Sequence, residues 1–281
     1  MNAILHTIAE LNQIQISEIT PLSGGSINSV YLLKSNTKKY VLKVNDASKF
    51  PNMFETEARG LQILKESKSF QTPEVKTQNE FENTSYLLME YIPSGNKTSN
   101  FNELFAENLS KIHHSTQDYF GLSHHNYIGS LPQYNSKEKS ASEFYINQRL
   151  KPQLKLASQK GYTFNQLEKV FKNISDIIPN EPSSLIHGDL WNGNYLISTK
   201  GEPCLIDPAI SYSIREMDIA MMHLFGGFSD EIFNLYHEQF PLTENWQDRI
   251  SLWQLYYLLV HLNLFGSGYF SQVNSIMKQY S

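Results

Sequence analysis

Residues 184–208 place three polar side chains at fixed intervals between short apolar stretches, and this segment constrains the chain more than any other. Asp189 is followed five residues later by Asn194. Asp207 comes thirteen residues further on and directly follows the apolar run 204–206. A carboxylate, an amide and a second carboxylate are therefore expected close together around one loop.

Two glycines indicate what kind of loop this is. Gly188 directly precedes Asp189 and Gly193 directly precedes Asn194, and both permit backbone conformations that a Cβ atom would resist. Short apolar stretches stand on either side, at residues 185–186 and 195–197. This pattern predicts two short strands joined by a tight loop.

The spacing suits the transfer of a phosphoryl group, which needs an oriented hydroxyl and cations against the phosphate oxygens. Asp189 would accept the proton of the attacking hydroxyl, while Asn194 and Asp207 would supply the oxygen ligands that Mg²⁺ prefers. The catalytic loop of protein kinases is similar in its Asp-x4-Asn spacing and its later Asp. The alternative is that each is an ordinary turn residue. The functional reading is favoured because the spacing and both flanking strands occur together.

Longer motifs resemble the fructosamine kinase (ketosamine-3-kinase) family, whose wider relatives are aminoglycoside phosphotransferases and choline kinases. They are HGDLWNGN at 187–194, DPA at 207–209, REMDIAMMHLFGGF at 215–228 and FG-x4-NYIG-x2-PQ-x-N at 120–135. Trp191 and the R-E-M-D-I-A run point to the narrower family. The resemblance extends over nearly the whole chain from about residue 19 onwards.

The resemblance implies a protein-kinase-like α+β fold with two lobes. Residues 1–92 would form a small lobe built on an antiparallel sheet with one helix, and residues 93–281 a larger, mainly helical lobe. ATP would bind with Mg²⁺ in the cleft between them. The implied activity is transfer of the γ-phosphoryl group to the O3 hydroxyl of a ketosamine, a sugar adduct on an amine or a protein lysine. The implied biological role is deglycation.

A glycine-containing turn and a lysine lie in the stretch 16–45, which reads as three short strands. The resemblance implies that Gly24, Gly25, Ser26 and Asn28 cover the ATP phosphates and that Lys43 contacts them. Taken alone, Gly-Gly is a common hairpin turn. The loop departs from G-x-G-x-x-G, and no G-x4-G-K-[ST] motif occurs, so a Walker-type NTPase is disfavoured.

Apolar residues with a helical period begin at Phe54. By resemblance, Glu57 in this helix is the acid that pairs with Lys43 and holds it towards the phosphates. The alternative is a solvated carboxylate on a helix surface.

The apolar run 85–92 reads as a strand that the turn cluster 93–96 ends, and we place the lobe boundary there. By resemblance, the backbone groups of Glu90, Tyr91 and Ile92 would face the adenine. The alternative is a buried strand followed by a linker, and both can hold.

Three further residues receive roles around the catalytic loop. Trp191 follows the expected base by two residues and is assigned to the acceptor side, where its ring would offer an apolar and π surface. The alternative is an aromatic ring that packs the loop. The resemblance implies that Asp218 fixes the loop through hydrogen bonds to its backbone, and Asp218 and His187 are assigned to structural support.

Helical periodicity dominates the second half of the chain, at residues 101–113, 136–161, 165–178 and 244–265. The last of these is apolar on most faces and is expected to be core. His113 is expected to be a hydrogen-bonded core histidine, and adjacent histidine pairs do not form a zinc site. Four polar residues lie near the expected acceptor site without assigned contacts: Tyr127, Gln133, Asn135 and Arg149.

Composition excludes several classes of function. The net charge of −5 gives no basic excess for nucleic acid. The apolar stretch 252–265 is interrupted by polar residues and is too short to span a bilayer. The N-terminus has no basic n-region and reads as a short amphipathic helix, and the single cysteine allows no intrachain disulfide. We expect a cytoplasmic enzyme without a membrane or nucleic-acid partner, and the oligomeric state stays open.

Two alternatives to a ketosamine kinase remain. One is another small-molecule kinase of the same fold, acting on an aminoglycoside, choline or a related amino-alcohol. The other is a pseudokinase that binds nucleotide without catalysis. The pseudokinase is disfavoured because all five expected machinery residues are present: Lys43, Glu57, Asp189, Asn194 and Asp207.

Overall fold

The smaller lobe is built on a five-stranded antiparallel sheet with the strand order β1-β2-β3-β5-β4. The computed structural model describes residues 2–22 and 27–281. The strands of this sheet are β1 (Ile16–Leu22), β2 (Ser29–Ser35), β3 (Lys39–Asp46), β4 (Val75–Phe81) and β5 (Thr84–Glu90). The three strands expected from the first part of the chain are thus confirmed.

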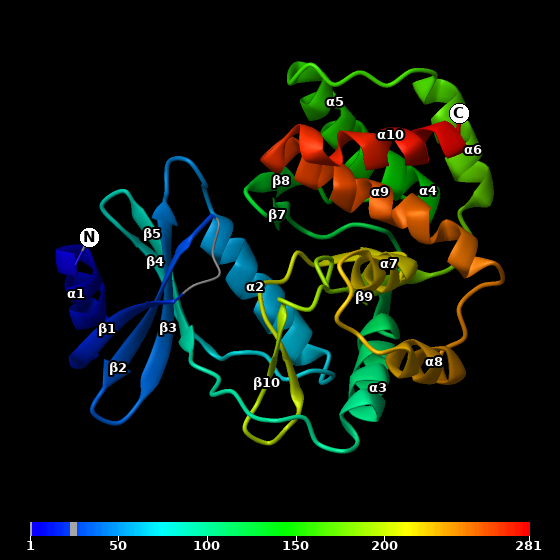
Figure 1. The fold of residues 1–281 in the computed structure, drawn as a ribbon. Helices are drawn as coiled ribbons and strands as arrows, with labels where there is room; N and C mark the ends of the chain where they lie inside the picture. Colours follow the sequence, from blue (N-terminus) through cyan, green and yellow to red (C-terminus); the bar gives the residue numbers. More distant parts are fainter. Residues whose placement is uncertain (1, 23–26) are drawn as a thin grey trace.

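One helix covers each face of the sheet (Figure 1). On the outer face, α1 (Asn2–Leu11) packs Leu5 and Ile8 against apolar side chains of the strands. On the inner face, α2 (Met53–Glu66) packs Phe54 against β5 and lies between the sheet and the larger lobe. The short amphipathic helix expected at the N-terminus is confirmed as α1, and the helix expected from Phe54 is confirmed as α2. Both faces of the sheet are apolar, so each needs a cover.

The alternation of side chains along β3 decides where its lysine points. Leu42 and Val44 belong to the cluster under α1. Val41 packs in the cluster on the α2 side, and Lys43 therefore also faces α2. The alternation therefore places Lys43 on the face of the sheet that points towards the inside of the molecule.

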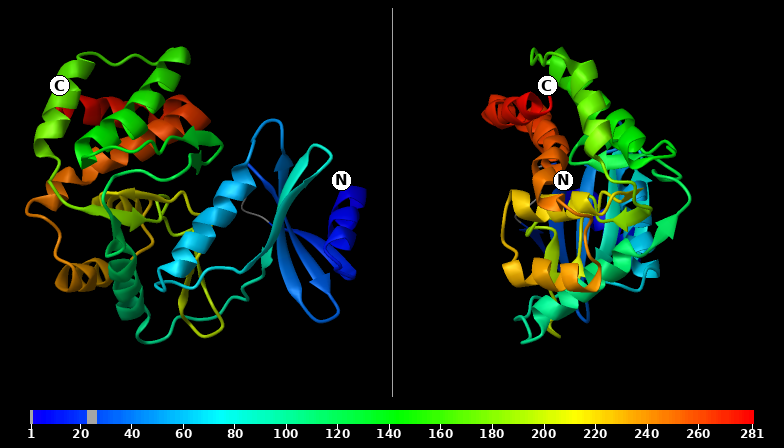
Figure 2. Two further views of the ribbon diagram at one scale, coloured as in Figure 1. Left: turned by 180° about the vertical axis from the view of Figure 1, so that it is seen from behind. Right: turned by 90° about the vertical axis from the view of Figure 1, so that its right-hand side faces the viewer.

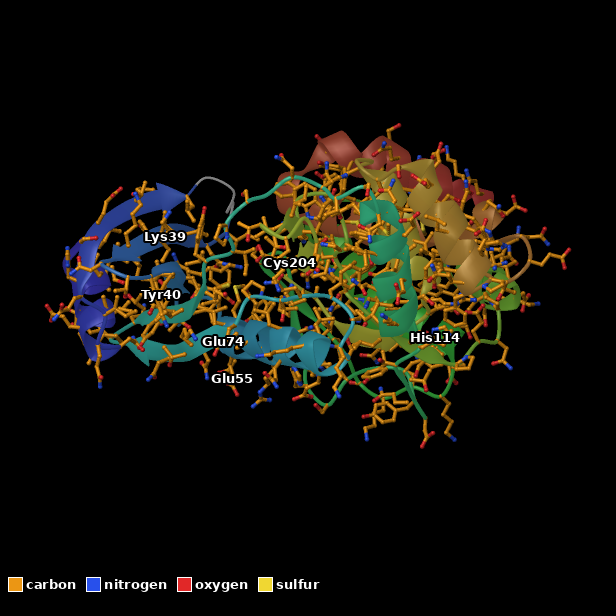
Figure 3. All side chains as sticks on the ribbon, turned by 90° about the horizontal axis from the view of Figure 1, so that it is seen from below. Lys39, Tyr40, Glu55, Glu74, His114 and Cys204 are labelled. Atoms are coloured by element: carbon orange, nitrogen blue, oxygen red, sulfur yellow. The ribbon has the colours of Figure 1, made fainter. Side chains whose placement is uncertain are left out.

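An extended segment, residues 91–100, connects β5 to α3 (Phe101–His113) in the larger lobe. The lobes also touch elsewhere, since Leu205 N donates to Gln71 O at 2.9 Å. Cys204 of β11 (Pro203–Leu205) forms a parallel β-bridge with Gln71 and lies between the lobes (Figure 3). A boundary between residues 92 and 93 stays a proposal.

The larger lobe is mainly helical and centres on α9 (Trp246–Phe265). The core around α9 includes Trp253 and Tyr256, both buried. The other helices of this lobe after α3 are α4 (Ala141–Phe144), the π-helix η1 (Tyr145–Leu150), α5 (Lys151–Gln159), α6 (Leu167–Ile177), α7 (Glu216–Leu224), α8 (Asp230–Gln239), the 3₁₀ turn η2 (Ser267–Tyr269) and α10 (Phe270–Gln279).

Short strands hold the segment that contains the expected catalytic loop. They form a three-stranded sheet of β12 (Ser211–Ser213), β9 (Ser183–Ile186) and β6 (Thr116–Gln117), the pair β10 (Tyr195–Ile197) and β11, and the pair β7 (Asn126–Ile128) and β8 (Leu131–Gln133). The loop runs from the end of β9 to the start of β10. The two strands expected to flank the loop are confirmed.

Helix boundaries differ from expectation at a few places. The helix expected from residue 136 begins at Ala141, after a segment in which Phe120 and Glu138 form a β-bridge. It contains the π-helix η1 and ends before Gly161, whose φ is +88°. The strand expected to reach residue 92 ends at Glu90.

The two chain ends lie in different lobes, the N-terminus beside the sheet and the C-terminus at the helical end (Figure 2). Within residues 2–22 and 27–281, none of the helices has the length and apolar character needed to cross a membrane.

Candidate active site

A cavity of about 840 Å³ lies between the two lobes and takes its walls from both. The smaller lobe contributes mainly apolar side chains of β2, β3 and β5, together with Lys43 and Glu57. The larger lobe contributes residues of the loop between β9 and β10, of the segment after β11, and of α7 and α9, among them Asp189, Asn194, Asp207 and Tyr257. Charged groups of both lobes therefore face one space.

Lys43 joins the lobes through two ion pairs. Its Nζ atom lies 2.7 Å from Oε1 of Glu57 on α2 and 2.6 Å from Oδ1 of Asp207 in the other lobe. Burial lowers the pKa of Lys43, but the carboxylates of Asp207 and Glu57 outweigh it, so the net shift is upward. Lys43 is therefore a fixed cation, and the expected pairing with Glu57 is present.

Asp189 and Asn194 are linked within the loop. Asn194 Nδ2 donates to Asp189 Oδ2 at 3.0 Å and to the backbone oxygen of Asp189 at 2.8 Å. Burial raises the pKa of Asp189 to about 7, the hydrogen bond from Asn194 opposes this, and the charges of Asp207 and Asp218 add to it. A carboxylate with such a pKa can hold a proton near neutral pH, as a general base must.

Asp218 at the start of α7 fixes the turn before Asp189. Its Oδ2 accepts a hydrogen bond from His187 N at 2.7 Å, and its Oδ1 accepts one from Gly188 N at 2.8 Å. His113 Nε2 lies 3.3 Å from Oδ2, and both side chains are fully buried. Gly188 has φ of +80°, and a Cβ atom there would overlap the Ala209 oxygen. The predicted contacts of Asp218 with the loop backbone are present.

His187 connects the loop to the strand that precedes Asp207. Its ring Nε2 is 2.9 Å from Ile206 O, and its ring Nδ1 accepts from Asp189 N at 3.3 Å. The backbone adds two links, from Ile206 N to Asn194 O and from Ala209 N to His187 O, each 3.0 Å. Asp189 and Asp207 are thereby held in a fixed relation although 18 residues separate them.

Asp207 is held in an unusual backbone conformation, with φ of +54°. Side chains other than glycine seldom adopt this region, and such residues cluster at functional sites. Its side chain is 45% exposed, so a carboxylate oxygen is open to the cavity.

The oxygen atoms of this region fit a magnesium ion. Asn194 uses its NH₂ group on Asp189, which leaves its amide oxygen as the atom for a cation. Asp207 uses Oδ1 on Lys43, which leaves Oδ2. Two protein oxygens with additional oxygens from substrate phosphates and water form the type of site in which Mg²⁺ is usually bound.

The remaining predictions concern residues that would contact the nucleotide, and some of these residues lie outside the part of the chain that the structure describes. Gly24, Gly25 and Ser26 lie there, so their roles stay predictions. Four other predicted residues line the cavity: Asn28, Glu90, Tyr91 and Ile92. Asn28 Oδ1 also accepts from Asn45 Nδ2 at 3.2 Å.

Trp191 lines the cavity and is 37% exposed. Its ring stands edge-on to Phe225, with centroids 6.3 Å apart, and it lies directly over Gly193, where a Cβ atom would overlap it. The ring therefore has one side on the loop and another open to the cavity.

Sequence reasoning missed the contribution of α9. Its expected role was core alone, but one edge of the helix lines the cavity through Tyr257, Val260, His261, Leu264 and Phe265. The signal was present in the sequence: Tyr257, His261 and Phe265 recur every four residues and so share one face. A cavity wall and a core face are both apolar, and only the neighbouring elements distinguish them.

Of the four polar residues predicted near the acceptor site, three are buried: Gln133, Asn135 and Arg149. Arg149 Nη2 donates to Asn135 Oδ1 at 2.8 Å, and Gln133 Nε2 donates to Ala209 O at 2.9 Å. Gln133 therefore supports the segment that follows Asp207, whereas Arg149 supports the segment that contains Asn135. Tyr127 lines the cavity.

Comparison with known proteins gives a consistent result. Residues 1–281 match the family model described as fructosamine kinase. The chain is 37% identical over 269 residues to a "probable ketoamine kinase" of Enterococcus faecium, a match that covers 94% of this chain and 95% of that one. It is 36% identical over 286 residues to a chloroplastic protein-ribulosamine 3-kinase of Arabidopsis thaliana, covering 97% and 85%.

Solved structures agree. A "putative fructosamine-3-kinase" from Thermobifida fusca is 31% identical and superimposes with a TM-score of 0.84 over 99% of this chain and 98% of that one. The corresponding protein of Haemophilus somnus is 26% identical, with a TM-score of 0.89 over 99% and 96%. An aminoglycoside phosphotransferase in complex with AMP-PNP and hygromycin B shares only the fold, at 15% identity and a TM-score of 0.67 over 99% and 98%.

Proposed function

Because the chain belongs to the fructosamine kinase family, we propose that it transfers the γ-phosphoryl group of ATP to the O3 hydroxyl of a ketosamine. The family, the kinase-like fold and an ATP-dependent phosphotransferase activity on a sugar hydroxyl follow from the comparisons. The substrate class rests on the relatives named for ketoamines and ribulosamines. The physiological role that we propose is removal of sugar adducts from amines or proteins.

One observation carries the chemical part of the proposal. Asp189, with a pKa near 7, lines the same cavity as the ion-paired Lys43 and Asp207. The O3–H group would donate a hydrogen bond to the Asp189 carboxylate. As the bond from O3 to the γ-phosphorus forms and the bond from that phosphorus to the β–γ bridging oxygen breaks, the O3 proton passes to Asp189.

The other residues would position charge during this step. Lys43, held by Glu57, would contact the phosphates of ATP. Asn194 and Asp207 would bind Mg²⁺, which neutralises charge on the phosphate oxygens. The glycine turn of residues 24–28 and the backbone of residues 90–92 would contact the remainder of the nucleotide, so that residues 1–92 form the nucleotide lobe and 93–281 the lobe for acceptor and catalysis.

A phosphotransfer screen tests the function. The purified protein would be incubated with Mg-ATP and with erythrulosamine, ribulosamine or fructosamine adducts, and with kanamycin and choline as controls. We expect ADP formation that depends on a ketosamine. Turnover of kanamycin or choline alone would instead support another small-molecule kinase, and thermal stabilisation by Mg-ATP with no turnover of any acceptor would support a pseudokinase.

The product offers a second, independent check. A phosphate on C3 lies next to the C2 carbonyl, and proton loss from C1 gives an enaminol that expels the phosphate. A ketosamine 3-phosphate should therefore release inorganic phosphate and the free amine on mild heating. A product that stays intact would place the phosphate on another hydroxyl.

A further inference from the structure

Much of the cavity wall that the larger lobe contributes is apolar. Its apolar part is formed by β7, by α7 and the residue that follows it, and by α9, through Ile128, Met221, Phe225, Val260 and Leu264. A sugar has hydroxyl groups in several directions. In an apolar pocket, its orientation must be set by the few polar groups that remain available.

Two polar side chains of this wall, from Asn126 and Tyr127, already have protein partners. Asn126 donates from Nδ2 to Ile210 O at 2.9 Å, and its Oδ1 accepts from Gln133 and Asn135. Tyr127 donates its hydroxyl to Pro51 O at 3.0 Å. Neither side chain needs a substrate atom to complete its hydrogen bonds.

Tyr257 differs from both. Its side chain lines the cavity and is 1% exposed, and its hydroxyl oxygen is buried without a hydrogen-bond partner among the described residues. Burial raises the pKa of Tyr257 well above its usual value, and the charges of Asp218 and Asp189 act in the same direction, so the phenol stays protonated. A buried hydroxyl is seldom left unpaired, since desolvation without compensation destabilises the fold.

We propose that the Tyr257 hydroxyl forms a hydrogen bond with a hydroxyl or carbonyl oxygen of the acceptor sugar and is a specificity-determining residue for it. This inference rests on the proposed function and adds that α9 contacts the sugar part of the substrate through Tyr257. The phenol can donate and accept, and it shares the cavity with Asp189. The bond orients the sugar against a wall that is mostly apolar. An acceptor without an oxygen atom opposite the Tyr257 hydroxyl loses this bond.

The neighbouring residue provides a matched control. Tyr256 is also buried, but its hydroxyl donates to Gln133 Oε1 at 2.8 Å inside the core. The test compares Tyr257→Phe with Tyr256→Phe, each missing one buried hydroxyl. Binding of an Nε-ribulosyl-Nα-acetyllysine probe to the full-length enzyme with Mg-ADP is measured by calorimetry, and melting temperature is measured without ligand.

We expect Tyr257→Phe to bind the probe about tenfold more weakly, to bind Mg-ADP as wild type does, and to melt no lower than wild type, since an unpaired group is removed. Tyr256→Phe should melt lower, because a core hydrogen bond is lost, and should bind the probe within about twofold of wild type.

Three outcomes would overturn the inference. Equal probe binding by Tyr257→Phe and wild type would reject the subsite while leaving the proposed function intact. A melting temperature for Tyr257→Phe as low as that of Tyr256→Phe would mean that the hydroxyl serves the core. Absence of probe binding to the wild-type enzyme would reject the proposed function and the subsite with it.

A series of probes, each lacking one sugar hydroxyl, identifies the recognised oxygen. One deoxy probe should bind wild type about tenfold more weakly than the parent and should bind Tyr257→Phe no more weakly than the parent does. If every deoxy probe affects the two proteins equally, Tyr257 does not contact the sugar.

Discussion

Asp189 and Asp207 are two carboxylates of one cavity with different surroundings. Asp189 accepts a hydrogen bond from Asn194 and is shielded enough that its pKa rises to about 7. Asp207 is paired with Lys43 and keeps a more exposed side chain. At the scale of single residues, this difference makes Asp189 suited to take up a proton and Asp207 suited to bind a cation.

Replacement of Asp189 by Asn tests the first role. The change removes the proton acceptor, keeps the size of the side chain and spares both expected magnesium ligands. We expect kcat with a ketosamine to fall by about a thousandfold, while the affinity for Mg-ATP measured by calorimetry stays unchanged. Near-normal turnover would exclude Asp189 as the base.

Trp191→Ala tests the acceptor side. If the open side of the ring contacts the sugar or a protonated amine, KM for the ketosamine should rise about tenfold, the equivalent of roughly 1.4 kcal/mol, while KM for ATP hardly moves. Trp191→Phe retains a ring and serves as the control, with a smaller rise. A parallel rise in KM for ATP, or a large fall in melting temperature, would assign the ring to packing of the loop over Gly193.

At the scale of elements, buried ion pairs hold the larger lobe together around the catalytic loop. Arg215, just before α7, donates to both carboxylate oxygens of Glu181, which precedes β9, at 2.9 and 3.0 Å. It also donates to Phe240 O and Pro241 O after α8. This pair joins the strand that leads into the loop, the helix that carries Asp218 and the connection to α9.

The Glu181 pair predicts a pH-dependent part of the stability. Burial raises the pKa of Glu181, but Arg215 and Thr243 outweigh it, and the net shift is downward. A carboxyl whose folded-state pKa is depressed stabilises the fold fully above its unfolded-state pKa, about 4.3, and loses this contribution as the pH falls towards the lower folded-state pKa. The ion pair should therefore stabilise the fold at pH 7, and its contribution to the free energy of unfolding should decline below about pH 4.

Thermal unfolding of Glu181→Gln measures this contribution. At pH 7 we expect the variant to be less stable by about 2 kcal/mol, since a charge-assisted pair in a largely buried site is lost. The difference from wild type should shrink as the pH is lowered below 4. Glu202→Gln, at an exposed position, is the control and should track wild type at every pH. A deficit for Glu181→Gln that does not change with pH would contradict the assignment.

At the scale of the whole molecule, the cavity exists only because two lobes meet. Its walls come from the sheet and α2 on one side and from the loop, α7 and α9 on the other. Lys43 and Asp207 form an ion pair across the two lobes. A ligand that contacts both walls should therefore stabilise the folded chain as a unit.

The melting temperature should show this linkage. At a concentration of Mg-ATP about 100 times its Kd, wild type should gain roughly 2.7 kcal/mol, which corresponds to a rise of several degrees. Asp207→Ala should lose most of this gain, and ATP with EDTA should give wild type a similarly small gain. An undiminished shift in Asp207→Ala would argue against Asp207 as a magnesium ligand.

The sequence by itself determined those parts of the site that are close along the chain or carried by a regular period. The interval between Asp189 and Asn194 fits a tight loop, so their contact follows from local geometry. The alternation along β3 points Lys43 away from the face that packs on α1. Its pairing with Glu57, which the family resemblance implied, is present in the structure.

Tertiary structure decided which distant elements share the site. Nothing in the local pattern of residues 244–265 distinguishes a helix buried on all sides from one that gives an edge to a cavity, so Tyr257 was assigned to the core. The contact of His113 with Asp218 joins residues from helices 105 positions apart. Periodicity reports which face of an element is apolar, whereas the partner of that face is fixed by packing between elements, which a local pattern does not encode.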